Sequence, residues 1–350
     1  MYKPNYRITD DLLKKIAQIE AIRAQIDSSQ ILPQREIEMR YRATVEATHS
    51  STSIEGNPLN IKQVERVLSD KQPLTRHQYA ETEVRNYKKA IDFIDKRKTT
   101  DEKLTATDIS KIHKIITNGL LNDARKEGAW RKNHVYIENK DGNTIYDGPN
   151  PIVVPNEIEK LLSWLSNDSY NIHPIIASAI MHYQFVSIHP FADGNGRTTR
   201  ILTALYLGLR GYDFRGSLVL DSYYSTDKKA YYGALHDVQG YNYNSAETAG
   251  LNSWLDYFVA GFLSSANVLY AEVKILGSLL NDAPVGMKIS RDEADILGYI
   301  QQFGSITLSE AEDVLSNVPR RTIQRKLKGL VDTGYIRVDG ATNQARYTKK

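Results

Sequence analysis

Twelve consecutive residues, 189–200, combine a histidine, an aspartate, two glycines and two arginines in the order His-Pro-Phe-Ala-Asp-Gly-Asn-Gly-Arg-Thr-Thr-Arg. The apolar residues before them predict a helix that runs up to His189 and ends at Pro190, because proline cannot continue a helix. The Gly-Asn-Gly turn that follows leads straight into a second helix. The free N–H groups and the positive dipole end of that helix therefore point into the turn, and such an arrangement binds anions, phosphate above all.

The charged side chains of this segment have the types that phosphoryl or nucleotidyl transfer needs. Arg197 and Arg200 are three residues apart, so they share one face of the second helix and add two fixed positive charges. Asp193 could hold Mg²⁺, which favours one carboxylate together with phosphate oxygens. His189 has an imidazole whose ordinary pKa suits a general base near neutral pH. The residues predicted to bind the phosphates are Gly194, Asn195, Gly196, Arg197, Thr198 and Arg200.

The segment matches, position by position, the signature His-x-Phe-x-(Asp/Glu)-Gly-Asn-Gly-Arg-x-x-Arg of the Fic family, so the chain resembles a Fic protein. The resemblance implies an ATP-dependent AMP-transferase that modifies Ser, Thr or Tyr hydroxyls of target proteins, with the chain itself among the candidate targets. It also implies His189 as the catalytic base, ATP as co-substrate and Mg²⁺ on Asp193 as the cofactor. Without the resemblance, a helix–loop–helix corner with His189 capping a helix and solvated arginines is the alternative.

Other functions stay open beside AMP transfer. Some relatives transfer phosphate or phosphocholine, and some remove AMP. Intact Gly194 and Gly196, rather than a lysine in the turn, favour nucleotidyl transfer over the kinase-like variant. A nucleotide-sensing DNA-binding regulator is the alternative from another class. His189 and Asp193 favour the enzyme, because a sensor needs the anion-binding turn but no base.

A short β-hairpin is predicted ahead of the signature. Residues 134–137 and 144–146 are β-prone runs around a polar, glycine-containing turn, in a region that is otherwise helical in pattern. With Gly-Ala-Trp-Arg at 128–131 before it, this hairpin resembles the family's flap, which docks the target segment as an added strand. The alternative is a surface hairpin that closes over the core. The resemblance implies that the docking residues are Arg131, Val135, Tyr136 and Ile137.

Residues 51–56, Ser-Thr-Ser-Ile-Glu-Gly, resemble the family's inhibitory pattern (Ser/Thr)-x-x-x-Glu-(Gly/Asn). The resemblance implies a class whose inhibitory helix, here about residues 33–56, is N-terminal and in the same chain. Glu55 would then pair with Arg200 and occupy the space needed by the γ-phosphate, because a carboxylate satisfies the arginine and repels a polyphosphate. The alternative is an exposed Glu55 at a helix end. The inhibitory residues implied are Ser51, Glu55 and Gly56.

Two tyrosine pairs follow the signature, at residues 223–224 and 231–232. The resemblance implies a Tyr-Tyr pair near the adenine pocket, and Tyr231 and Tyr232 are assigned to it, since an aromatic face can stack on a base. Half-buried packing is the alternative for these tyrosines. Five other histidines show no spacing typical of metal ligands and are predicted to be packing or surface residues: His113, His134, His173, His182 and His236.

The fold that must position these residues is predicted to be mainly α. It is expected to be a Fic-type helical bundle with a β-hairpin flap, plus a C-terminal winged helix-turn-helix domain. Helical periodicity, the linker signals and the resemblance together imply an N-terminal helical region (1–100), a Fic catalytic domain (101–276), a linker (277–287) and a winged-helix domain (288–350). Helices are predicted at 10–28, 33–56, 61–68, 76–97, 105–119, 155–166, 172–188, 195–210, 228–236, 249–276, 291–303, 308–315 and 319–332.

The last 63 residues differ in charge from the rest of the chain. Residues 288–350 hold eleven Lys or Arg against eight Asp or Glu, which leaves 34 of each sign for residues 1–287. The whole net charge of +3 therefore belongs to this tail, whose third helix could lie in a DNA major groove. Winged helices also bind proteins or form dimers, so a DNA or protein partner is predicted for 288–350, and a homodimer stays open.

Composition sets broad limits on the protein. Of its 350 residues, 41% are hydrophobic and 25% charged, as is ordinary for a globular protein. The absence of cysteine excludes disulfides, thiolate metal sites and cysteine nucleophiles, and it fits a cytoplasmic protein. The N-terminus has no apolar segment typical of a signal peptide, and no uninterrupted apolar run approaches bilayer length, so no membrane association is expected.

Overall fold

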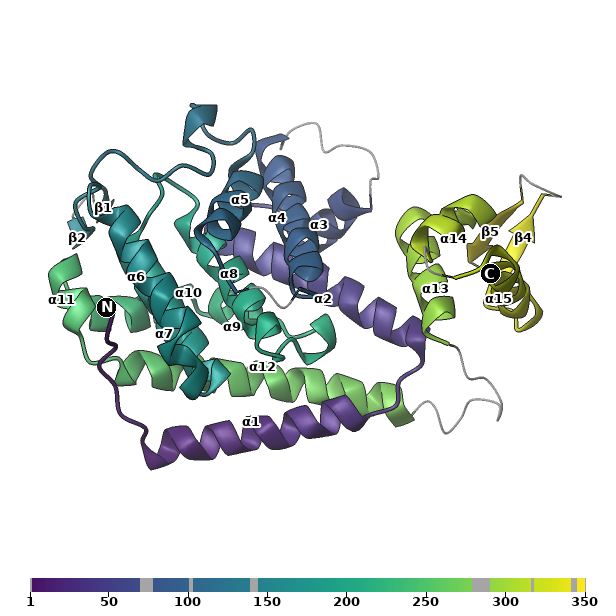
Figure 1. The fold of residues 1–350 in the computed structure, drawn as a ribbon, viewed down its shortest axis with the longest axis horizontal. Helices are drawn as coiled ribbons and strands as arrows, with labels where there is room; N and C mark the ends of the chain where they lie inside the picture. The colour runs from purple at the N-terminus through teal and green to yellow at the C-terminus, as the bar shows by residue number, and fades with distance from the viewer. Residues whose placement is uncertain are drawn as a thin grey trace. The chain divides into compact units, whose positions relative to one another are not determined.

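The computed structural model describes residues 2–69, 78–100, 103–138, 144–278, 290–315, 318–340 and 345–349. Two compact units form: unit 1 comprises Met1–Asp27 and Arg42–Tyr270, and unit 2 comprises Ser28–Tyr41 and Ala271–Lys350. Both α2 (Pro33–Ile54) and α12 (Asn252–Ser278) begin in one unit and end in the other, and the last residue of α1 (Asp10–Ser28) also belongs to unit 2 (Figure 1). The predicted linker at 277–287 therefore begins inside α12, and its remainder lies outside the described residues.

Unit 1 is helical apart from one hairpin, in which the strands β1 (Tyr136–Glu138) and β2 (Thr144–Asp147) pair antiparallel. Its other helices are α1 (Asp10–Ser28), α3 (Ile61–Leu68), α4 (Gln78–Arg97), α5 (Ala106–Thr117), α6 (Val154–Ser166), α7 (Pro174–Ile188), α8 (Asn195–Leu209), α9 (Leu220–Thr226), α10 (Lys228–Gln239) and α11 (Tyr243–Thr248). Short 3₁₀ turns lie at Ala124–Lys126, Asp168–Asn171 and Phe214–Gly216. The helices α9 and α11 are absent from the sequence prediction, because six or seven residues are too few to show a helical period.

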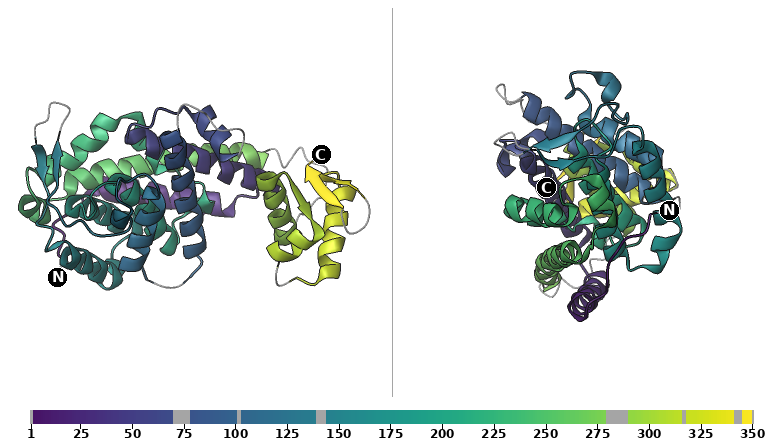
Figure 2. Two further views of the ribbon diagram at one scale, coloured as in Figure 1. Left: turned by 90° about the horizontal axis from the view of Figure 1, so that it is seen from above. Right: turned by 90° about the vertical axis from the view of Figure 1, so that its left-hand side faces the viewer.

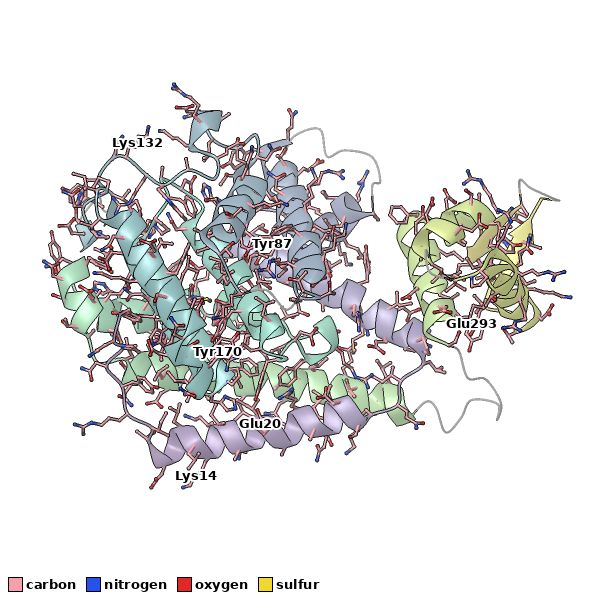
Figure 3. All side chains as sticks on the ribbon, viewed as in Figure 1. Lys14, Glu20, Tyr87, Lys132, Tyr170 and Glu293 are labelled. Atoms are coloured by element: carbon pink, nitrogen blue, oxygen red, sulfur yellow. The ribbon has the colours of Figure 1, made fainter. Side chains whose placement is uncertain are left out.

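The two helices that flank the predicted site form the centre of unit 1. α7 is apolar on every side, with Ile175, Ile180 and Phe185 at most 1% exposed. It packs against α8, which in turn packs against α4 and α5. Figure 3 shows the dense side-chain packing in this region, with Tyr87 of α4 in the interior. Since both α7 and α8 are held in the core, the loop between them has fixed ends.

α12 is long and apolar enough, by length and composition alone, to cross a bilayer (Asn252–Leu276, mean hydropathy 1.2). One face of this helix packs in the core of unit 1, where Trp254, Phe258 and Phe262 are fully buried. Of the apolar window in this helix, 33% is buried within the protein. The sequence analysis predicted this helix but considered only uninterrupted apolar runs as membrane spans. It therefore did not identify α12 as a candidate span, because polar residues separate its apolar ones.

Unit 2 contains, in its described part, three helices of its own and a small sheet. The helices are α13 (Arg291–Phe303), α14 (Leu308–Val314) and α15 (Arg320–Asp332). The strands β3 (Ser305–Thr307), β4 (Ile336–Asp339) and β5 (Arg346–Lys349) form an antiparallel sheet in the order β3-β5-β4. Figure 2 shows β4 and β5 side by side against the helices of this unit. Ile306, Ile323 and Leu327 are fully buried in its core.

The sheet of unit 2 has three strands, where the sequence predicts a two-stranded ribbon. The added strand is β3: Gly304, with a φ of 80°, ends α13, and the next three residues pair with β5. Ile306 in the middle of β3 is buried, so the strand contributes to the core. Three residues between two helices show no alternation long enough to recognise, which is why the sequence pattern missed this strand.

Candidate active site

The predicted anion-binding turn is the loop between α7 and α8. α7 ends at His189, whose φ of 49° is left-handed and whose N–H donates to Phe185 O at 3.1 Å. Gly194, with a φ of 76°, starts α8 without a side-chain cap. The Asn195 side chain closes the loop, since its Oδ1 accepts from Phe191 N–H (2.9 Å) and its Nδ2 donates to Phe191 O (2.8 Å). The first turn of α8 is therefore left open to an anion.

The His189 imidazole is half-buried at the lip of this turn. Its Nδ1 lies 3.3 Å from Val186 O, and because a carbonyl can only accept, Nδ1 carries the hydrogen and Nε2 keeps its lone pair. Burial lowers the pKa of His189 to about 4, against the smaller opposing effect of the hydrogen bond to Val186. The ring is therefore neutral at pH 7 and can accept a proton at Nε2.

The end of α2 is joined to α8 through one arginine. Arg200 Nε donates to Ser51 Oγ (2.6 Å), and Arg200 Nη2 donates to Ser51 O (3.0 Å) and to Glu55 Oε1 (2.8 Å). Asp221 adds a longer ion pair, with 3.4 Å between its Oδ1 and Arg200 Nε, and accepts from Tyr87 Oη at 3.1 Å. The Arg200 side chain is 1% exposed. The structure thus brings Ser51, Glu55 and Arg200 together.

The Glu55 carboxylate lies over the first turn of α8. A Cβ on Gly196 would overlap Glu55 Oε1 and approach Arg200 Nη1 to 3.2 Å, so a side chain at this position would require the Glu55 carboxylate to move. Two nearby donors, Arg197 Nε and Arg200 Nη1, are buried and have no hydrogen-bond partner within the described residues. Buried polar groups are rarely left unsatisfied, so these donors mark space for anion oxygens. The Glu55 carboxylate lies beside Gly196 and accepts from Arg200 Nη2 at 2.8 Å.

The other arginine of the motif is held by a residue that the sequence analysis missed. Arg197 Nη1 pairs with Glu83 Oε1 of α4 at 2.5 Å, and Arg197 Nη2 lies 3.6 Å from Asp193 Oδ1. Glu83 Oε2 also accepts from Asn57 Nδ2 at 2.6 Å, just after the left-handed Gly56 (φ 98°) that follows α2. Burial raises the pKa of Glu83, against the opposing charge of Arg197. Glu83 and Arg197 are 114 positions apart, so no local pattern could have paired them.

Asp193 presents its carboxylate at the outer side of the loop, where its side chain is 58% exposed. Within the described ranges, no group of three or more His, Cys, Asp or Glu is arranged to hold a metal ion. One accessible carboxylate beside an anion-binding turn fits Mg²⁺, because this ion keeps several waters and takes further ligands from phosphate oxygens. Asp193 is therefore the residue that would hold the ion.

The stem of the β1–β2 hairpin is fastened to the motif loop by Arg131. The Arg131 N–H donates to Pro190 O (2.9 Å), its Nε donates to His189 O (2.8 Å), and its Nη2 donates to Pro149 O (2.6 Å). The residue is only 5% exposed. The structure therefore gives Arg131 the task of holding the hairpin against the loop, and its guanidinium does not face solvent as a docking residue would.

The remaining residues predicted to dock a target lie on or beside β1. Tyr136 is 56% exposed, whereas Val135 and Ile137 are half-buried. Opposite them on β2, Tyr146 is buried and donates through its Oη to Ser187 O at 2.8 Å, which anchors the hairpin to α7. The predicted hairpin turn, residues 139–143, lies outside the described residues.

The two tyrosines predicted near the adenine pocket lie in different environments. Tyr231 is 1% exposed, and its hydroxyl is 2.9 Å from His182 Nε2 in the core. Tyr232 is 46% exposed, and partial burial together with the nearby Glu55 raises its pKa to about 12. The hydroxyl of Thr198, another predicted phosphate-binding residue, is buried and donates to Gly194 O at 2.8 Å. Tyr232 thus keeps an accessible ring near Glu55, while Tyr231 and Thr198 bond within the protein.

Comparison with known proteins finds a family model that is similar to the segment carrying this site. Residues 103–207 match the Fic/DOC family. A protein adenylyltransferase Fic from Drosophila willistoni is 27% identical over 201 residues, which cover 57% of this chain and 39% of the relative. The protein adenylyltransferase Fic from Drosophila melanogaster is 30% identical over 166 residues, 47% of this chain and 32% of the relative. The chain therefore spans about a third to two-fifths of the length of these curated relatives.

Solved structures share the fold. A Fic family protein from Desulfovibrio desulfuricans G20 has a TM-score of 0.64 at 22% identity, covering 100% of this chain and 98% of that chain. A Fic domain containing signaling protein from Bacteroides thetaiotaomicron VPI-5482 also reaches 0.64 at 21% identity, over 73% of this chain and 97% of that one. At these identities the likeness shows the fold, a mainly helical Fic fold with a small β-hairpin. Residues 103–207 are therefore similar to the Fic/DOC family, and the chain has a Fic fold and a partial likeness to the protein adenylyltransferases Fic.

Proposed function

We propose that this chain is a protein adenylyltransferase, which moves AMP from ATP to a Ser, Thr or Tyr hydroxyl of a target protein, with the chain itself among the candidate targets. The observation that carries the proposal is the neutral His189, with Nε2 free to accept a proton, at the lip of an anion-binding turn that still has unsatisfied arginine donors. A nucleotide sensor would need the turn and the arginines but no base. The names of the curated relatives support the same assignment.

In the proposed reaction the target hydroxyl oxygen bonds to the α-phosphorus of ATP while the bond from that phosphorus to pyrophosphate breaks. His189 Nε2 takes the hydroxyl proton. The N–H groups at the start of α8 and the free Nε of Arg197 donate to phosphate oxygens, and Glu83 holds the Arg197 guanidinium in place for this contact. Asp193 would hold Mg²⁺, which would neutralise phosphate charge.

We further propose that Glu55 inhibits the reaction from within the chain. Its carboxylate holds Arg200 Nη2 at 2.8 Å and lies where anion oxygens would approach Gly196. ATP would have to displace this carboxylate or bind in a strained position, because two negative groups cannot share the site. A charge-assisted Arg–carboxylate hydrogen bond contributes about 1.5–3 kcal/mol, enough to disfavour productive ATP binding about tenfold or more.

Labelled ATP distinguishes this function from its alternatives. The Glu55→Gly chain is incubated with Mg²⁺ and ATP labelled at either the α- or the γ-phosphate, alone and with a cell lysate. Protein label from the α-position only indicates AMP transfer, and label from the γ-position indicates phosphate transfer. Nucleotide binding without any protein label would favour a sensor. Loss of label from a pre-modified protein would reveal AMP removal.

Two variants test the assigned roles in the same assay. His189→Ala should abolish labelling while ATP binding survives, because the base is not needed to hold phosphate. Asp193→Ala and treatment with EDTA should each stop the transfer. Near-wild-type transfer by His189→Ala would remove the base assignment, and full activity without divalent metal would remove Asp193 from its role.

For unit 2 we propose a winged helix that recruits a partner, with DNA as the partner that its charge favours. The α15 face that points to solvent carries Arg321, Arg325 and Lys328. Arg320, in the same basic run, is paired with both carboxylate oxygens of Glu312 at 2.9 and 2.7 Å. Fewer basic side chains are therefore available to bind a partner than the basic run of this helix indicates.

A further inference from the structure

A buried histidine of α5 joins two segments that are far apart in the sequence. His113 Nδ1 accepts from Gly128 N–H at 2.8 Å, and His113 Nε2 lies 2.9 Å from Asp193 O. An amide N–H can only donate and a carbonyl can only accept, so Nδ1 is bare and Nε2 carries the hydrogen. The side chain is fully buried, which excludes water as a substitute partner for either nitrogen.

The same face of α5 supports the motif loop by packing. The His113 ring stacks on Phe191, with ring centroids 3.6 Å apart and planes within 4° of parallel. Trp130 contacts Phe191 as well, at 4.9 Å between centroids. One turn further along α5, Thr117 Cγ2 would come within 2.9 Å of a Cβ on Gly194. α5 therefore fits closely against the loop that carries Asp193.

The two segments that His113 joins both belong to the site. Gly128, with a φ of 78°, begins the stem that reaches the hairpin through Arg131, and Arg131 is bonded to His189 O. A Cβ at position 128 would lie 2.8 Å from Ser110 O of α5, so this stem lies directly on the helix. On the other side, the peptide that His113 holds is the one from which the Asp193 carboxylate extends.

We propose that His113 is a positioning residue, which holds the hairpin stem at Gly128 and the peptide that carries the Asp193 carboxylate in one fixed arrangement. The proposal rests on the proposed function, because the direction of this carboxylate matters when it holds Mg²⁺ for bound ATP. His113 would act on a bound nucleotide through its neighbours Asp193, Phe191 and Gly194. A residue that merely fills the core would need bulk alone, whereas this position requires one acceptor and one donor on opposite edges of a side chain.

Two side-chain amides separate the two hydrogen bonds. His113→Gln extends its amide to the position of Nε2 and can keep the donor to Asp193 O. His113→Asn extends its amide only to the position of Nδ1 and can keep the acceptor for Gly128 N–H. Both variants are made in the full Glu55→Gly chain. The same two substitutions at His173 are the matched control, because that ring contacts Glu20 and Tyr212 away from the site.

Calorimetric titration with ATP, in Mg²⁺ and in EDTA, measures the effect on the nucleotide. His113→Asn should bind ATP in Mg²⁺ about five- to tenfold more weakly and bind ATP in EDTA within about twofold of the parent, which is the loss expected for one hydrogen bond. His113→Gln should keep the Mg²⁺-dependent affinity. Amide hydrogen exchange over residues 128–138 should show the reverse order, with faster exchange in His113→Gln. Thermal unfolding confirms that both variants are folded.

The outcomes separate this proposal from the proposed function. Equal weakening in Mg²⁺ and in EDTA, or affinities and exchange rates unchanged from the parent, would overturn the positioning role while leaving nucleotide transfer intact. A parent chain that binds no ATP would overturn the proposed function, and with it the part of the proposal that concerns Asp193. The exchange measurement would still decide whether His113 holds the stem at Gly128.

Discussion

Glu55 and Arg200 are 145 positions apart in the chain, yet Glu55 Oε1 accepts a hydrogen bond from Arg200 Nη2 at 2.8 Å. The same guanidinium donates twice to Ser51, one turn earlier on α2. Both ends of the inhibitory pattern thus engage a single side chain of the helix that is proposed to bind phosphate. The last turn of α2 is consequently latched to α8, and contacts that stabilise this latch should slow the proposed reaction.

Glu55→Gly and Glu55→Gln should both raise AMP transfer, because each frees Arg200 and removes a negative charge from the space over Gly196. We expect about tenfold or more at low ATP concentration, falling as ATP saturates the site. Initial rates of self-modification over a range of ATP concentrations measure the effect. Glu65→Gln, an exposed glutamate on α3, is the control and should behave as wild type. Identical rates for the Glu55 variants and wild type at every concentration would show that the pattern at 51–56 is coincidental.

Lys228→Ala should also raise the rate, although it removes a residue that lies outside both motifs. Lys228 Nζ donates to Ser53 O at the C-terminal end of α2, where a cation is stabilising because of the helix dipole. Losing about 0.5–1 kcal/mol from the latch predicts a two- to fivefold increase in the transfer rate. Lys229→Ala is the matched control, because Lys229 is the next residue along the chain and its side chain is exposed. A lower rate in Lys228→Ala than in Lys229→Ala would contradict the latch.

A buried histidine beside Tyr231 predicts how stability responds to acid. His182 lies between Thr203 Oγ1 (3.0 Å) and Tyr231 Oη (2.9 Å), and burial lowers its pKa from 6.5 to about 3. Below pH 6.5 the unfolded chain binds this proton and the folded chain does not. The contribution of neutral His182 to the free energy of unfolding is therefore fully present above pH 6.5, and it is lost as the pH falls towards 3.

Replacing His182 should remove the part of the acid-induced fall in the free energy of unfolding that this residue causes. Between pH 7 and pH 5 this part is about 2 kcal/mol, from the difference in proton binding of a group with an unfolded pKa of 6.5. His182→Gln keeps hydrogen-bonding groups and should reduce the fall in the free energy of unfolding between these pH values by that amount. Urea unfolding at both pH values measures it, with the exposed His236→Gln as the control. An unchanged pH dependence in His182→Gln would rule out the assigned cause.

Unit 2 offers a test of DNA binding with an internal control. Arg321→Ala and Arg325→Ala should each weaken binding of a short duplex and lower the salt dependence by about one unit of slope, because each removes a phosphate contact. Arg320→Ala should have a smaller effect, since Glu312 already neutralises that charge. Fluorescence anisotropy of the full chain with labelled DNA at several salt concentrations gives all three values. Negligible affinity at physiological salt would leave a protein partner as the function of unit 2.

The sequence was most informative where the chemistry is contiguous. The residues from His189 to Arg200 form one loop and one helix turn, so their mutual placement follows from local structure alone. Glu55 could be paired with Arg200 only through a family pattern, because nothing local relates residues on α2 and α8. The fold of unit 1 was predictable to the same extent: long helices with a clear period were found, and the short α9 and α11 were not.

The sequence was silent where a residue matters through its neighbours in space. Glu83 lies in a polar helical stretch that resembles a solvated face, yet it is 6% exposed and holds Arg197. His113 shows no metal-ligand spacing, and its two hydrogen bonds become visible only when α5 is packed against the loop. Arg131 was expected to face a target, whereas its donors are used by three carbonyl groups. Type and spacing alone do not reveal tertiary partners of this kind.

Position 196 is constrained twice over. The missing side chain of Gly196 leaves the space that the Glu55 carboxylate occupies, and under the proposed function a nucleotide would need the same space. A larger residue there would expel both occupants together. A replacement of Gly196 should therefore weaken the contact between Glu55 and Arg200, because its Cβ would overlap Glu55 Oε1.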